Sequence, residues 1–152
     1  MTLRIEALNR ALAGIPPEKV RYHWCWGRWH GAHVNDIPLT HIVDIALKVK
    51  AQTYSFEAAN VRHRHEMGVW KEVKLAPGTI LMPGVISHAT NLVEHPELIA
   101  RRLVDWARIV GRENVVGGAD CGMGGRVHAE IGWSKLAALV EGAALATKTL
   151  RN

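Results

Sequence analysis

Short apolar runs alternate with stretches of helical periodicity along the whole chain. Four runs of apolar or alternating residues predict β-strands, at about residues 20–25, 52–58, 79–86 and 114–120. Elsewhere apolar residues recur at spacings of three and four, which predicts helices at about 1–14, 39–50, 67–73, 96–110 and 129–150. Strands and helices that alternate in this way are typical of an α/β domain whose parallel sheet is covered by helices.

The ends of the predicted helices carry residues that suit those positions. Pro16 and Pro17 stop the first helix, because proline cannot continue one. Pro96 suits the first position of the helix at 96–110, and Gly111 suits its C-terminal cap. In the last helix we expect one apolar face to form the core, and its members are Ile131, Leu136, Leu139, Val140 and Leu145.

Length and composition are those of one soluble domain. The 152 residues fit a single domain, residues 1–152, that can bury a core. Hydrophobic residues make up 48% and charged residues 22%, as in ordinary globular proteins. No apolar run reaches the roughly 18–20 residues that span a bilayer, and the first ten residues lack the apolar core of a secretory signal. We therefore expect a cytoplasmic protein with no membrane partner.

Charge and cysteine content narrow the possible partners. The net charge is +5, but lysine and arginine are dispersed, with no basic run longer than Arg101-Arg102. This distribution favours a generally basic surface over a nucleic-acid interface, so we expect no nucleic-acid partner. The chain has two cysteines. Without a secretory signal they are more typical of free, catalytic or metal-bound thiols than of a disulfide.

Metal-ligating side chains lie where the predicted strands end. His23 and Cys25 are two residues apart on the first strand, so they share one face. Glu57 ends the second strand, and Cys121 follows the fourth. The carboxyl ends of parallel strands meet at one rim of an α/β fold. The sequence therefore predicts that these four side chains converge on one site.

The predicted ligand set suits one metal and one kind of chemistry. An imidazole, two thiolates and a carboxylate fit tetrahedral zinc, whereas soft sulfur ligands disfavour magnesium and calcium. With Zn²⁺ such a site carries about one net negative charge, which makes it poor at splitting water but suited to binding a substrate thiol. A thiol that is deprotonated in this way can attack an alkyl carbon.

Each of the four residues also has a simpler structural explanation. Cys25 can be a small buried hydrophobe and His23 a core histidine bonded to a backbone carbonyl. Glu57 can pair with Arg62 or Arg64, and Cys121 can line a glycine-rich turn. From the residues alone both interpretations stay open.

Four motifs resemble those of one enzyme family. They are His23–Cys25 (HWC), Tyr54–Asn60 (YSFEAAN), Pro83–Ile86 (PGVI) and Asp120–Gly122 (DCG). Their order and spacing are similar to those of the catalytic C-terminal domain of the cobalamin-independent methionine synthases. The wider family includes the zinc-dependent epoxyalkane:coenzyme M transferases. The resemblance covers residues 20–150.

The resemblance implies a (β/α)₈ TIM barrel that binds zinc and transfers a methyl or alkyl group to a thiol. Homocysteine with 5-methyltetrahydrofolate is one such pair of substrates, and thiol addition to an epoxide-derived substrate is the alternative. The family's zinc ligands correspond to His23, Cys25, Glu57 and Cys121. Its proton-donating histidine follows the third strand; here His88 lies one position early and Ala89 occupies the matching slot.

Further candidates surround the predicted site. His30 and His33 lie in the loop after the first strand, where they can contact substrate or orient a ligand. Arg126 ends the glycine-rich run after Cys121, and its guanidinium suits a substrate carboxylate or sulfonate.

The chain is short for the fold that the resemblance implies. A (β/α)₈ barrel needs about 250 residues, and four βα units supply half of one. We expect the open half to be closed by an N-terminal half-barrel partner chain or by a second copy in a homodimer. A third possibility is a non-catalytic subunit that binds zinc and a thiol and needs a partner for chemistry.

Overall fold

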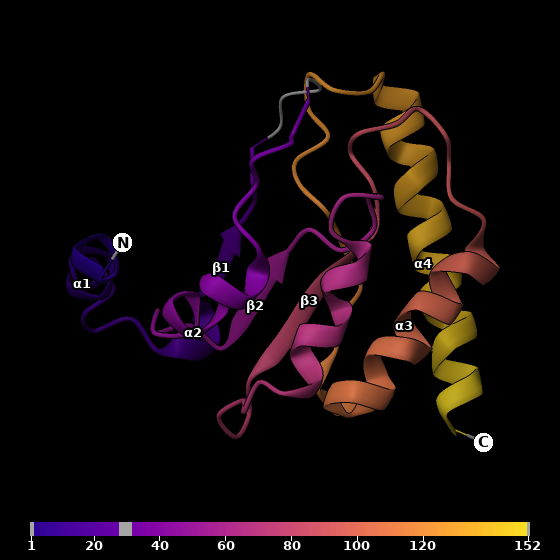
Figure 1. Cartoon of the computed structure of the whole chain (residues 1–152). Coiled ribbons are helices and arrows are strands. Elements are labelled where there is room, and N and C mark those ends of the chain that lie inside the picture. Colours follow the sequence, from indigo (N-terminus) through magenta and orange to yellow (C-terminus); the bar gives the residue numbers. More distant parts are fainter. Residues whose placement is uncertain (1, 28–31, 152) are drawn as a thin grey trace.

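Four parallel strands form one sheet in the order in which they occur along the chain (Figure 1). The computed structural model describes residues 2–27 and 32–151. The strands are β1 (Arg21–Trp24), β2 (Thr53–Phe56), β3 (Ile80–Ile86) and β4 (Gly118–Ala119). Each strand lies beside the next, without the reversal of order that defines a doubly wound sheet. This is the winding of a (β/α)₈ barrel, of which the chain supplies half, so the predicted fold class is confirmed.

Helices of unequal length connect the strands. The α-helices are α1 (Thr2–Ala11), α2 (Val43–Ala46), α3 (Pro96–Val110) and α4 (Ala129–Arg151). Short 3₁₀ helices lie at η1 (Pro17–Lys19), η2 (Leu39–His41), η3 (Arg64–Lys71) and η4 (Arg112–Asn114). Figure 1 shows α3 and α4 side by side, with α1 set apart at the opposite side of the fold. In the described part of the chain, no helix is long and apolar enough to cross a membrane.

The core lies on one face of the sheet. Side chains alternate along each strand, and those of Trp24, Phe56 and Leu81 are buried beneath the helices. Trp24 stacks on Phe56 with a centroid distance of 5.1 Å, and Phe56 stacks on Trp70 of η3 at 4.6 Å. On the opposite face His23 is exposed. One face is therefore covered by the aromatic core, and the other, which we call the open face, is exposed at His23 and closed at its neighbour Ser55.

A second core joins α3 and α4 to the end of β3. Ile99 and Leu103 of α3 pack with Val85 and Ile86 and with small residues of α4. A Cβ on Gly142 would lie 2.6 Å from the Cβ of Ile99. The two helix backbones approach so closely that a hydrogen is the only substituent that fits at this position.

The predicted helix at 39–50 is wrong in its length. The chain instead forms η2 and the single turn α2, separated by Ile42 with φ −122°. Contacts with distant residues hold both ends of the stretch: Glu66 Oε1 accepts from the N–H of Leu39 at 2.6 Å, and the Tyr54 hydroxyl donates to the carbonyl of Val49 at 2.7 Å. The β-branched residues of this stretch also favour helix only weakly.

The predicted strand at 114–120 is also too long. Only Gly118–Ala119 pairs continuously with β3, Val115 makes an isolated bridge to Leu81, and the register shifts between Gly84 and Ile86. Glycine in a strand marks irregular pairing or a close backbone approach. The predicted short helix at 67–73 is a 3₁₀ helix that begins three residues earlier, at Arg64.

The predicted core face of the last helix is wrong for most of its members: Leu139 packs against the second core, but Leu136, Val140 and Leu145 are exposed. The buried residues of α4 are Lys135, Ala138, Gly142 and Ala146. Val140 is 71% exposed and Trp133 72%. Small residues face α3 because the close approach excludes large ones, and Lys135 is buried because Glu94 Oε2 lies 2.8 Å from its Nζ. An apolar stripe of α4 is therefore left uncovered.

Two glycines of α4 provide a test of this packing. We expect Gly142→Ala to destabilise the protein by about 1–2 kcal/mol, since the new methyl overlaps Ile99 and the carbonyl of Pro96. Gly132→Ala in the same helix meets Val127 only at 3.8 Å, so it should gain up to about 1 kcal/mol of helix propensity. Urea unfolding of the two variants measures both effects. Equal stability of the two variants would contradict the packing.

Candidate metal centre

Three metal-ligating side chains lie together on the open face of the sheet. His23 belongs to β1, Cys25 follows its last residue, and Cys121 comes two residues after β4. One ligand atom of each lies within 4.8 Å of those of the other two. The two Sγ atoms are 3.9 Å apart. Residues 96 positions apart in the chain thus form one compact group of nitrogen and sulfur donors.

His23 is held by its neighbour on the next strand. The register of the sheet sets His23 opposite Ser55, and His23 Nδ1 hydrogen-bonds Ser55 Oγ at 3.1 Å. Burial lowers the pKa of His23, against the smaller raising effects of Ser55 and Asp120. A neutral imidazole with one nitrogen already bonded has Nε2 available for a metal.

Cys121 disfavours the ionisation of Cys25. Partial desolvation by the surrounding protein raises the pKa of Cys25, whose side chain is still exposed, and Cys121 and Glu57 raise it further. The N–H of Gly27 opposes this effect by hydrogen-bonding the sulfur. The pair is therefore arranged so that a cation bound between the sulfur atoms would relieve the repulsion that their thiolates would feel.

Glu57 lies beside this group but is not part of it. Its buried carboxylate accepts from the N–H of Trp26 at 3.2 Å through Oε1 and from Asn60 Nδ2 at 2.6 Å through Oε2. Arg62 Nη2 is 3.7 Å from Oε2. Burial and the nearby Asp120 carboxylate raise the pKa of Glu57. Trp26 follows Cys25 directly, so Glu57 is anchored next to a ligand residue.

The other predicted site residues take different positions. His88 follows β3 and is 1% exposed. Arg126 is half-buried in the turn after Cys121, and its N–H donates to the carbonyl of Met123 at 3.0 Å. Neither belongs to the group formed by His23, Cys25 and Cys121, and their roles stay predictions.

Of the two loop histidines predicted near the site, His33 lies among the described residues and contacts other polar groups. His33 Nδ1 lies 2.9 Å from Asp36 Oδ1, and His63 Nε2 lies 3.4 Å from Asp36 Oδ2. His63 Nδ1 in turn lies 2.9 Å from Glu66 Oε2. His33 therefore belongs to a polar network that ties its loop to η3. His30 lies outside the described residues.

Sequence reasoning missed the residues that hold the ligands in place. Ser55, Asn60 and Asp120 contact His23, Glu57 and the backbone after Glu57. Ser55 shares the predicted face of Glu57, and Asn60 and Asp120 lie inside two of the motifs. Their positions beside candidate ligands were the one signal in the sequence that could have identified them. Neither spacing nor residue type distinguishes a polar side chain that supports a ligand from one that does not.

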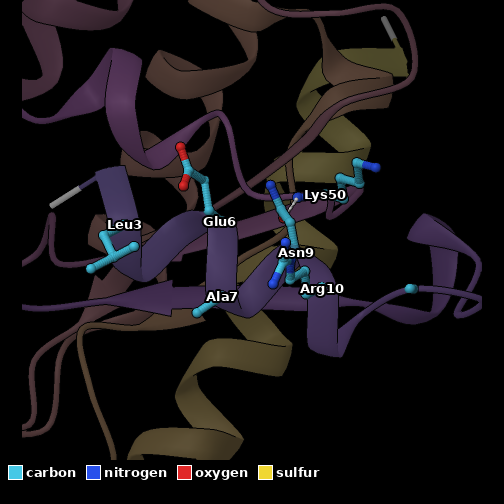
Figure 2. A pocket seen from close by; sticks show the side chains of 7 residues that line it. Leu3, Glu6, Ala7, Asn9, Arg10 and Lys50 are labelled. Atoms are coloured by element: carbon cyan, nitrogen blue, oxygen red, sulfur yellow. Dashed lines mark hydrogen bonds between the residues drawn. The ribbon is translucent and has the colours of Figure 1, made fainter.

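A wide groove lies away from the candidate ligands. It encloses about 700 Å³ between α1 and Lys50, where the N–H of Lys50 donates to Asn9 Oδ1 at 2.8 Å (Figure 2). None of the predicted site residues lines it. A cavity of about 420 Å³ opens instead between the loops after β2 and β3, and Asn60 and Ser87 line it. None of His23, Cys25, Glu57 and Cys121 lines this cavity, although Asn60 joins it to Glu57 by a hydrogen bond.

The chain is a half-barrel α/β protein that carries a cluster of one histidine and two cysteines, and its fold has a counterpart among solved structures. It is similar to the structure of a B12-independent methionine synthase from Shewanella sp. W3-18-1 in complex with selenomethionine, with a TM-score of 0.75. The sequences are 24% identical, so this likeness establishes the fold alone. It covers 96% of this chain and 43% of that chain.

Sequence comparisons add no relative. No protein-family model matches the chain. No curated protein matches it either.

The proximity of the two thiols can be tested without any metal. In protein treated with a chelator, we expect the diazene oxidant diamide to join Cys25 and Cys121 in an intramolecular disulfide, because their Sγ atoms already lie 3.9 Å apart. The diamide takes up the two thiol hydrogens and is reduced to a hydrazine. Mass spectrometry of a non-reduced digest identifies the linked peptides.

Cys121→Ser serves as the control, since it leaves Cys25 with no partner in its own chain. If oxidation of the unaltered chain gives only disulfides between molecules, the convergence of β1 and β4 is wrong.

Proposed function

We propose that the chain binds one zinc ion through His23, Cys25 and Cys121, with Glu57 as the fourth ligand, and transfers a methyl or alkyl group to a substrate thiol. The observation that carries the proposal is the meeting of the three donors within 4.8 Å on the open face of the sheet. The reaction class is that of the cobalamin-independent methionine synthases, the family that the sequence motifs resemble.

The donor set fits zinc better than other metals. Two sulfur atoms and an imidazole are typical of tetrahedral zinc and unlike the oxygen cages of calcium or magnesium. Three protein ligands and one exchangeable position are the pattern of catalytic zinc. Glu57 supports an exchangeable role, because its carboxylate has hydrogen-bond partners in Trp26 and Asn60 when it is not a ligand.

The residues of the chain support thiol alkylation. A zinc ion held here would keep the sulfur of a substrate thiol deprotonated at neutral pH. The substrate sulfur forms a bond to the alkyl carbon, and the electron pair of the broken bond leaves with the donor. We propose that His88 supplies the proton for this leaving group and that Arg126 binds an acidic group of the substrate, with His30 and His33 near the entrance.

A complete (β/α)₈ barrel requires a second half-barrel. The chain spans 43% of the methionine synthase that it resembles in fold. Its sheet has two edge strands, β1 and β4, and its open face carries the candidate ligands. The exposed apolar residues of α4 add a surface of the kind that proteins bury in interfaces. We propose that residues 1–152 form one domain whose partner is an N-terminal half-barrel chain or a second copy.

One observation favours a different class of function. His23 and Cys25 are exposed, whereas catalytic centres exclude water. The chain alone would then be a zinc- and thiol-binding subunit that becomes catalytic only after a partner covers the site.

Zinc binding is the first expected result. We expect one zinc ion per chain, and His23→Asn should weaken its affinity by more than the roughly 10–100-fold that follows loss of a residue supporting a ligand. His41→Asn is the matched control, because His41 is an exposed histidine outside the site. Competition with a chromophoric chelator measures both affinities. Equal affinity of the two variants would rule out the proposed ligand set.

Turnover distinguishes the candidate reactions. Zinc-loaded protein should alkylate homocysteine or coenzyme M when a methyl donor is supplied, and product is measured by mass spectrometry. Product from an epoxide but not from a methyl donor selects the epoxide reaction. Zinc binding without product, in the chain alone and after addition of a half-barrel partner, favours the binding subunit and contradicts the enzymatic proposal.

A further inference from the structure

We infer that Asp120 is a positioning residue that fixes the turn after Glu57 against Cys121 and so preorganises the metal ligands. The expected effect on metal binding rests on the proposed function. The evidence for the positioning role is independent of it, because that evidence consists of hydrogen bonds and packing around one buried carboxylate.

The carboxylate of Asp120 is enclosed by the turn that follows Glu57. Asp120 is fully buried, and Oδ1 accepts from the N–H groups of Ala58 and Ala59, each at 2.7 Å. Oδ2 accepts from the N–H of Asn60 at 2.9 Å and from Asn60 Nδ2 at 3.1 Å. Hydrogen bonds to an ionised carboxylate are about twice as strong as neutral ones. Three consecutive residues therefore take their position from one side chain.

The same residue connects three strand ends. Its own N–H donates to the carbonyl of Ile86 at the end of β3, at 3.0 Å. Asn60 Nδ2, which binds Asp120, also donates to Glu57 Oε2 at 2.6 Å. Cys121 follows Asp120 directly in the chain. A shift of Asp120 is thus transmitted to Glu57 through Asn60 and to Cys121 through the backbone.

Gly84 provides the space for this carboxylate. A Cβ on Gly84 would lie 2.0 Å from Asp120 Oδ1 and 2.7 Å from the Asp120 backbone. β3 therefore passes directly beneath the carboxylate, which is confined between the strand and the turn. Confinement of this kind distinguishes a positioning residue from a solvent-facing aspartate, since the side chain has no alternative place.

The charge of Asp120 is needed as well as its shape. Both oxygens accept two hydrogen bonds each, so an amide in place of the carboxylate would set a donor NH₂ against N–H groups. We expect Asp120→Asn to release one side of the turn, which withdraws Asn60 from Glu57 and lets Cys121 move relative to Cys25. Loss of a residue that orients metal ligands typically weakens metal binding by about 10–100-fold.

The test uses two readouts on Asp120→Asn in the whole chain. The first is the affinity for zinc together with the visible absorption of the Co²⁺-loaded protein, which reports the geometry of the sulfur ligands. The second is the equilibrium of the Cys25–Cys121 disulfide with glutathione in metal-free protein, which reports how close the two sulfurs are held. We expect about 10–100-fold weaker zinc binding, an altered Co²⁺ spectrum and a disulfide about tenfold less favoured.

A matched control separates positioning from stability. Ala146→Gly lies in the buried face of α4 and should destabilise the fold by about 1 kcal/mol without changing either readout. If Asp120→Asn leaves both readouts at the values of the unaltered chain, the inference is wrong while the proposed function stands. If the unaltered chain binds no metal, the proposed function fails, and the disulfide equilibrium still decides the role of Asp120.

A second variant covers the case in which Asp120→Asn does not fold. Asn60→Ala removes the amide that joins Asp120 to Glu57, together with the oxygen that accepts from the N–H groups of Arg62 and His63. It leaves the backbone hydrogen bonds to Asp120 in place. We expect a weaker effect, about tenfold on zinc affinity, with Cys25 and Cys121 still forming their disulfide. Unchanged zinc affinity in this variant would overturn the link between Asp120 and Glu57.

Discussion

The structure depends on the approach of Cys121 to Cys25 across the open face of the sheet. These residues follow β4 and β1, the two edge strands, which in a flat sheet would lie about 14 Å apart, three strand spacings of about 4.8 Å. Their Sγ atoms are instead 3.9 Å apart. The sheet must curl and the chain must turn inward at the strand ends for this contact to form. The short β4 ends at Ala119, and the backbone bond from Asp120 to Ile86 is the last to β3 before Cys121 turns inward.

The curl of the sheet also explains why the candidate metal ligands and the aromatic core lie on opposite faces. On the convex face, the aromatic side chains of Trp24, Phe56 and Trp70 stack beneath the helices. On the concave face lie the polar residues at the strand ends, of which His23 and Cys25 are exposed and Glu57 and Asp120 are buried. Burial raises the pKa of Cys25 and Glu57, so the cluster resists accumulating negative charge unless a cation joins it. The same open face, with the uncovered apolar stripe of α4, leaves room for a partner that would complete a barrel.

Much of the fold follows from the sequence, because its signals are local. The structure confirms the four parallel strands, and α3 begins at Pro96 and ends before Gly111 as its capping residues indicate. The convergence of His23, Cys25 and Cys121 follows from strand alternation and from the common rim of parallel strands. Binding of zinc by them, and the ligand role of Glu57, stay predictions.

The remaining features depend on contacts between distant segments. The stretch around α2 is held at both ends by distant residues, because Glu66 accepts from the N–H of Leu39 and the Tyr54 hydroxyl donates to the carbonyl of Val49. In α4 the close approach at Gly142 selects the buried face by shape, so hydrophobic periodicity gives the wrong answer. The role of Asp120 is invisible in sequence because its partners are backbone N–H groups 60 to 62 residues away. Contacts between residues so far apart in the chain leave no periodic pattern in the sequence.

The most direct measurement is X-ray absorption spectroscopy at the zinc edge of protein loaded with one zinc ion per chain. A zinc ion bound as proposed has two sulfur neighbours at about 2.3 Å, one imidazole nitrogen at about 2.0–2.1 Å and one oxygen neighbour. Addition of a substrate thiol should replace the oxygen neighbour with a third sulfur. A shell of nitrogen and oxygen atoms alone, or a third sulfur that never appears, would contradict a thiol-activating centre at this site.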